Sequence, residues 1–134
     1  MAKINLQKIV NVKGKQGLFH LNAYNPKGYH LQPLGGGPVI FIANERDKVL
    51  ALGNVDFKLT EGTINLMDIF IKMDENPPQN VLDLKSYFHS IVPELDAAIP
   101  ESQLRKVVSW FSLIKDEYEI KEMVNEEDDG LMIT

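Results

Sequence analysis

The sequence predicts an α+β protein in which a small antiparallel β-barrel of the SH3-like kind, or a strongly bent sheet, precedes a helical subdomain. Short apolar runs cut by Gly and Pro, as in VKGKQGLFHL, fill the chain before Gly62. After Gly62, apolar residues recur at helical spacing, as in LRKVVSWFSLI. The charge also changes at Gly62. Residues 1–62 carry eight basic and four acidic side chains, a net charge of +4. Residues 63–134 carry six basic and fifteen acidic side chains, a net charge of −9, so the whole chain has a net charge of −5.

Four strands are expected first, because β-branched and aromatic residues alternate with turn residues. Gly14 and Gly17 bracket a tight turn, the tetrad at 25–28 has Pro in its favoured early position, and the glycines at 35–37 form a hairpin tip. The expected strands are Lys8 to Val12, Gly17 to Tyr24, Tyr29 to Leu34 and Pro38 to Ala43.

The segment from Asp47 to Gly53 is ambiguous, because its apolar residues fit a helical turn as well as a strand. Val55 to Leu59 alternates clearly and predicts one more strand. Five short strands in about sixty residues are typical of a small barrel or bent sheet.

Three helices follow. The first runs from about Leu66 to Met73 behind the cap residue Asn65, and the second from about Asp83 to Val92, ended by Pro93. The third begins near Ser102 after Pro100. Its apolar stripe is expected to be core, with Trp110 beside it: Leu104, Val107, Val108, Phe111 and Ile114.

These elements predict two lobes and a tail. Residues 1–62 form the strand lobe and residues 63–120 the helical lobe, with a proline-containing linker at about 74–80. Residues 121–134 are expected to be an acidic tail, whose self-repulsion frays any helix that reaches it. The final Leu131 to Ile133 is a candidate apolar plug for this protein or for a partner.

The composition of the chain excludes several kinds of site and of cellular location. The chain has no cysteine, which excludes disulfides and thiolate sites and is compatible with a reducing cytosol, so a cytoplasmic protein is expected. No stretch approaches a signal peptide or a membrane span, so no membrane partner is expected. The segments GKQG and GGGP lack the spacing and following helix of a phosphate loop, which favours turns.

Acid-base and metal candidates are few. The three histidines, His20, His30 and His89, have no metal-binding spacing, although His20 and His30 are candidates to face each other on neighbouring strands. Glu94 and Asp96 flank a helix end, where a cap or turn role is favoured. We therefore expect no enzyme activity and no cofactor.

One early segment and a later pair of segments carry a family resemblance: VKGKQGLFHL at 12–21, and LKSYFHSIVPELD with SQLRKVVSWFSLI at 84–96 and 102–114. They resemble an uncharacterised family of small Bacteroidetes proteins. Its members have a Gly-Lys-x-Gly-Leu-Tyr turn between two strands, a Tyr-Phe…Pro…Asp helix and a Lys…Trp-Tyr helix. The resemblance spans Asn5 to about Ile114 and implies no functional residues, since the family's function is unknown. The matching positions are Gly14, Lys15, Gly17, Leu18, Phe19, Tyr87, Phe88, Pro93, Asp96, Lys106, Trp110 and Phe111, with Phe19 and Phe111 where the family has Tyr.

Two functions remain open. The first is a non-catalytic module that binds another protein or a second copy of itself, with Trp110 either anchoring the partner or closing the seam between the lobes. The alternative is a nucleic-acid-associated protein, because Lys3, Lys8, Lys13 and Lys15 precede any acidic residue and aromatic residues follow closely; the aromatics could equally be core. The candidate contact residues are Lys3, Lys8, Lys13, Lys15 and Trp110.

Overall fold

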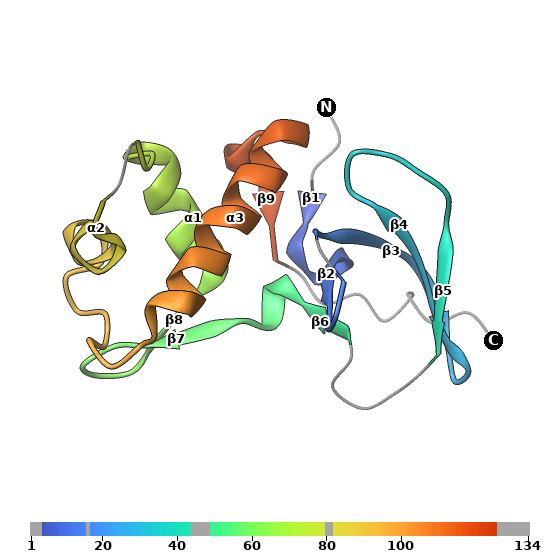
Figure 1. Ribbon diagram of the computed structural model, residues 1–134, viewed down its shortest axis with the longest axis horizontal. Helices are drawn as coiled ribbons and strands as arrows, with labels where there is room; N and C mark the ends of the chain where they lie inside the picture. The colour runs from blue at the N-terminus through green and yellow to red at the C-terminus, as the bar shows by residue number, and fades with distance from the viewer. Residues whose placement is uncertain (1–3, 16, 44–48, 80–81, 126–134) are drawn as a thin grey trace.

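A computed structural model describes residues 4–15, 17–43, 49–79 and 82–125. The fold is α+β: three helices gather on one side of the molecule and a five-stranded sheet on the other (Figure 1). Between them lies a small two-stranded sheet of β1 (Ile4–Asn5) and β9 (Met123–Val124). None of the helices in the described ranges is long and apolar enough to cross a membrane.

The five-stranded sheet is antiparallel throughout and follows the order β5-β4-β3-β2-β6. In the described residues β5 and β6 are its two edges and do not pair with each other. The sheet is therefore not closed into a barrel, which was one of the two predicted forms. Its strands are β2 (Ile9–Val12), β3 (Phe19–Asn25), β4 (Gly28–Pro33), β5 (Ile40–Ala43) and β6 (Val49–Ala51).

The fifth strand of this sheet does not come from Val55 to Leu59, the segment that the sequence favours. The ambiguous segment supplies β6, whereas the alternating segment from Val55 forms β7 (Asp56–Lys58), which pairs with β8 (Thr63–Asn65). The 3-10 turn η2 (Leu52–Asn54) separates β6 from β7. Leu52 and the β7 residue Phe57 are buried in the helical core, and this burial holds the β7–β8 hairpin in the helical lobe.

The three predicted helices are present. They are α1 (Leu66–Glu75), α2 (Leu84–Ile91) and α3 (Glu101–Glu117). Asn65 caps α1 by accepting a hydrogen bond from the Met67 amide at 3.0 Å, and Asp83 caps α2 in the same way through Ser86 at 3.2 Å. Both caps satisfy amides that a helix start leaves without a partner.

Two apolar cores lie under these elements. The sheet core consists of Val10, Val12, Phe19, Leu21, Leu31 and Ile42, which share one face of the sheet. The larger helical core also draws residues from the strand half of the chain. The contributors from residues 1–62 are Ile4, Leu6, Ile9, Leu18, Leu52 and Phe57. The two lobes therefore share apolar surface instead of having separate interiors.

The chain beyond α3 also belongs to this shared core. The 3-10 turn η3 (Ile120–Glu122) buries Ile120, and Met123 of β9 pairs with Ile4 in a parallel register. Residues 121–125, assigned above to the tail, are thus part of the fold because they bring apolar side chains to it. The rest of the predicted tail, including Leu131 to Ile133, lies outside the described residues.

Candidate functional site

A groove of about 290 Å³ lies between α3 and the chain that passes from the sheet to the helical lobe. Its strand side consists of Leu50 of β6 and the segment Val55, Asp56 and Phe57. Leu50 is 43% exposed, so its side chain contributes accessible apolar surface to the groove. The groove is therefore largely apolar on the side of the strands.

The helix side of the groove comes from one face of α3. Gln103, Lys106 and Trp110 follow the i, i+3, i+7 spacing of a single helical face. This face lies next to the buried stripe that contains Val107 and Phe111, so packing of the stripe fixes the direction of all three groove residues. Trp110 is half-buried and also packs against the helical core.

Some polar side chains of the groove have a hydrogen-bond partner within the protein and others do not. The Gln103 amide, the Lys106 ammonium and the Trp110 indole N–H have no hydrogen-bond or ion-pair partner in the described part of the chain. The Asp56 carboxylate, in contrast, accepts a hydrogen bond of 2.9 Å from Asn65 Nδ2. The side chains that line the groove thus include three donor groups without a protein partner. The Gln103 amide oxygen is also an acceptor, whereas the Asp56 carboxylate is already engaged.

Four amide side chains hold the strand side of the groove in place, and we call them the junction amides: Gln7, Asn54, Asn65 and Asn125. Asn125 donates to the Gly53 carbonyl at 2.9 Å and to Asn65 Oδ1 at 3.0 Å. Asn65 Nδ2 also donates to the Gly53 carbonyl at 3.0 Å. A Cβ atom at Gly53 would overlap Asn125 Oδ1 and Gln7 Nε2, so these contacts require glycine there.

We expect Asn65→Ala to lower the free energy of unfolding by about 2 kcal/mol, because it removes both a helix cap and bonds among the junction amides. Asp83→Ala is the matched control, since Asp83 caps α2 without joining the junction amides. It should cost about 1 kcal/mol. Chemical denaturation of both variants measures the difference. Equal losses would contradict a stabilising role for the junction amides.

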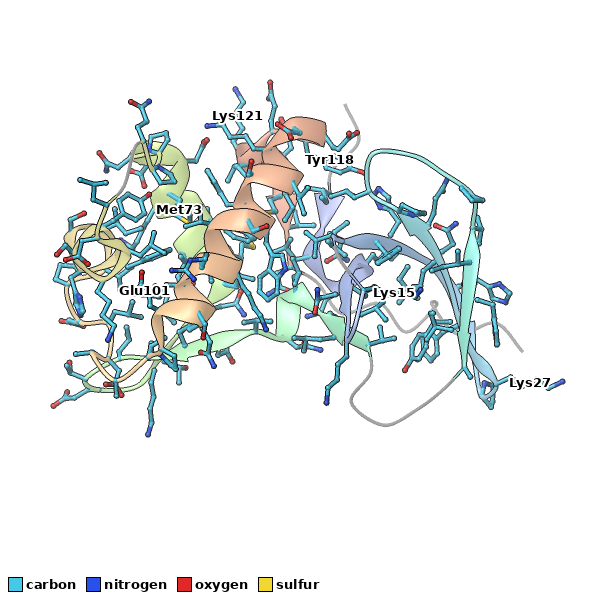
Figure 2. All side chains as sticks on the ribbon, viewed as in Figure 1. Lys15, Lys27, Met73, Glu101, Tyr118 and Lys121 are labelled. Carbon is cyan, nitrogen blue, oxygen red and sulfur yellow. The ribbon has the colours of Figure 1, made fainter. Side chains whose placement is uncertain are left out.

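A second contact joins the end of α3 to the sheet. The hydroxyl of Tyr118 lies 2.8 Å from His20 Nε2 of β3, and the two rings meet edge to face. Tyr118 comes next after the C-terminal end of α3 (Figure 2). Burial lowers the pKa of His20 from 6.5, and the nearby Glu117 carboxylate partly opposes this shift. Burial also raises the pKa of Tyr118, and Glu117 adds to that shift. Both groups are therefore held in their neutral forms.

This contact predicts a loss of stability in acid. Because the pKa of His20 is lower in the folded state, the unfolded chain binds the proton first, and stability falls as the pH falls from about 6.5 through the folded pKa. Chemical denaturation at about pH 7.5 and about pH 5 should show a smaller loss for His20→Gln than for the wild type. An equal loss in both proteins would contradict this role of His20.

The predicted lysines do not gather around Trp110. Lys13 and Lys15 are exposed in the turn between β2 and β3, whereas Lys8 is half-buried in the 3-10 turn η1 (Leu6–Lys8), at the other end of β2. Lys3 lies outside the described residues. The lysine beside Trp110 is instead Lys106, which the charge count did not single out. Its position one helical turn before Trp110 was the available signal.

The aromatic residues near the first lysines lie mostly inside the sheet lobe. Phe19 is buried in the sheet core, and Tyr24 and Tyr29 are half-buried against it with their rings stacked 5.8 Å apart. This matches the core interpretation of these residues.

The histidines lie apart. His20 is opposite Gln32 and His30 is opposite Ala23, so the expectation that they face each other was wrong: the register and an irregularity between Leu21 and Ala23 offset them. Over the described ranges, no three His, Asp or Glu side chains are placed to hold a metal ion. Asp96 has a turn role, because its Oδ1 accepts a hydrogen bond of 2.9 Å from the Ala98 amide.

Comparisons with known proteins bear on the fold alone. No family model matches the sequence, and no curated protein is similar to it. Among solved structures, the chain is similar to a Bacteroides vulgatus protein determined by solution NMR as a structural genomics target. The TM-score is 0.63 at 17% sequence identity, and the match covers 92% of this chain and 98% of the other. The two chains therefore share their architecture over nearly their whole lengths.

Proposed function

We propose that this protein is a non-catalytic interaction module that binds another protein in the groove beside Trp110. The observation that supports the proposal is the set of three donors without partners on α3, placed opposite an apolar wall that contains Leu50 and Phe57. Tryptophan in a partly buried pocket is the residue type that most often dominates protein interfaces. Gln103 and Lys106 are exposed, so on binding their donors exchange hydrogen bonds to water for hydrogen bonds to an acceptor of the partner.

The size of the groove indicates what it can hold. About 290 Å³ is near the lower limit of pockets that enclose a small molecule, roughly 300 Å³. One or two side chains of a protein segment fit such a volume. We therefore propose a protein segment as the ligand in preference to a cofactor.

We further propose that the chain belongs to the Bacteroidetes family that it resembles, and that it acts in the cytoplasm. The fold shared with a Bacteroides vulgatus protein supports the first point. Gly14 and Gly17, two of the matching positions, have φ values of 86° and 85°, which favour glycine.

The alternative function is association with nucleic acid. It is supported by Lys13 and Lys15, which are exposed and can contact phosphate groups. Nucleic-acid binding through this turn predicts affinity that falls steeply with salt and weakens in a Lys13→Glu, Lys15→Glu double variant.

Site-specific photocrosslinking in cells tests the proposed function. A benzophenone amino acid at Gln103 places the reactive group in the groove, and the same residue at Lys72, exposed on α1, is the control. We expect a protein adduct at position 103 that is absent at position 72 and survives nuclease treatment. Adducts that nuclease removes, or equal adducts at both positions, would contradict the proposal.

A further inference from the structure

We infer that the partner segment binds as an extended strand along β6, with a bulky apolar side chain against Trp110 and an acidic residue at Lys106. This inference rests on the function proposed above and specifies the conformation and chemistry of the ligand. Three features of the groove carry it: the open edge of β6, the direction of its side chains, and the charge on α3.

The first feature is the backbone of β6. It pairs with β2 on one side, with Val10 opposite Ala51 and Val12 opposite Val49, and within the described residues no strand pairs with its other side. In an antiparallel ladder, successive residues direct their N–H and C=O groups alternately to one neighbour and to the other. Part of β6 therefore presents backbone groups at the open edge, and an extended segment can pair with them.

The second feature is the direction of the β6 side chains. Val49 and Ala51 pack against the sheet core, whereas Leu50 lies on the opposite face and lines the groove. A strand added to β6 continues this alternation, because side chains on paired strands share faces. Every second side chain of the added strand then points to the face of the sheet on which Leu50 lines the groove, where the half-buried ring of Trp110 offers an apolar contact.

The third feature is the charge at the rim. Lys106 has no ion-pair partner in the described chain, and Asp56 across the groove is already hydrogen-bonded to Asn65. Lys106 and Asp56 thus give the groove lining one positive and one negative side chain, and Lys106 is the one whose charged group has no partner in the described chain. An acidic side chain in the segment complements Lys106 and brings acceptors for the Gln103 amide.

Selection from a display library of random 12-residue peptides tests the inference. The bait is the full chain, and peptides that also bind Trp110→Ala are discarded. We expect selected peptides to combine an acidic residue with a bulky apolar residue. Lys106→Glu should weaken their binding about 10-fold or more, whereas Lys72→Glu, which changes the net charge equally outside the groove, should change it less than about twofold.

The conformation is tested by N-methylation of each amide of one selected peptide. A strand directs alternate amides to its partner, so we expect affinity to fall about 10-fold or more at every second position and little at the positions between. Loss of affinity at consecutive positions would overturn the extended strand and leave groove binding intact. A library that yields no peptide dependent on both Trp110 and Lys106 would overturn the proposed function as well.

Discussion

Replacing Phe70 with alanine should lower the free energy of unfolding by about 3–5 kcal/mol. Phe70 is the central aromatic residue of α1: its side chain has no exposed surface, and its ring lies 5.9 Å from that of Phe111 on α3. Truncation removes this contact and leaves a cavity that the helices can only partly close. A loss of this size is comparable to the whole stability of a small domain, about 5–15 kcal/mol.

The matched control is Phe41→Ala, since Phe41 of β5 is 50% exposed. It should lower the free energy of unfolding by about 1 kcal/mol, because its ring contacts that of His30 on the neighbouring strand but its truncation leaves no buried cavity. Guanidinium denaturation followed by circular dichroism measures both variants. Losses of similar size in the two proteins would contradict the packing of α1 against α3.

Replacing Leu6 with alanine should cost about 2–5 kcal/mol and should destabilise both lobes together. Leu6 belongs to the strand half of the sequence, but its fully buried side chain lies in the helical core. Two lobes that share a core in this way are expected to unfold in one transition. Unfolding is followed by the fluorescence of Trp110 on α3, the single tryptophan of the chain, and by the amide NMR signals of β3 and β4 in the sheet.

Leu82→Ala is the control, because Leu82 is fully exposed and its truncation leaves no cavity. It should leave the free energy of unfolding within about 0.5 kcal/mol. Leu6→Ala would contradict the shared core if the tryptophan signal and the amide NMR signals of the sheet showed separate midpoints. A cost equal to that of Leu82→Ala would contradict it as well.

The helices were predictable because their signals are local. Asn65 and Asp83 cap the helices that their positions predicted, and the apolar stripe of α3 is buried as its spacing indicated, except that Val108 is only half-buried. The α+β class followed from the same local patterns. Pairing between strands is not local: the alternation that begins at Val55 predicted a strand but not that β8 would be its partner. The contribution of Met123 to the core was missed for the same reason, since its partner Ile4 lies at the other end of the chain.

The site was predictable only in part. Trp110 was singled out because the apolar stripe of α3 is complete without it, so part of this large aromatic side chain is left outside the core. The structure places Trp110 in the lining of the groove. Lys106 and Gln103 share its helical face, but their importance depends on Leu50 and Phe57, which come from the other half of the chain. The junction amides were missed because isolated Asn and Gln residues have no pattern that predicts a shared cluster.

Binding in the groove is tested most directly by the fluorescence of Trp110, since all tryptophan emission of this chain comes from that side chain. Titration with a peptide from the selection should shift the emission to shorter wavelength and saturate, because the half-buried indole loses its contact with water. The midpoint should agree with the dissociation constant measured by calorimetry. Saturable binding by calorimetry without any change in tryptophan emission would contradict the groove as the binding site.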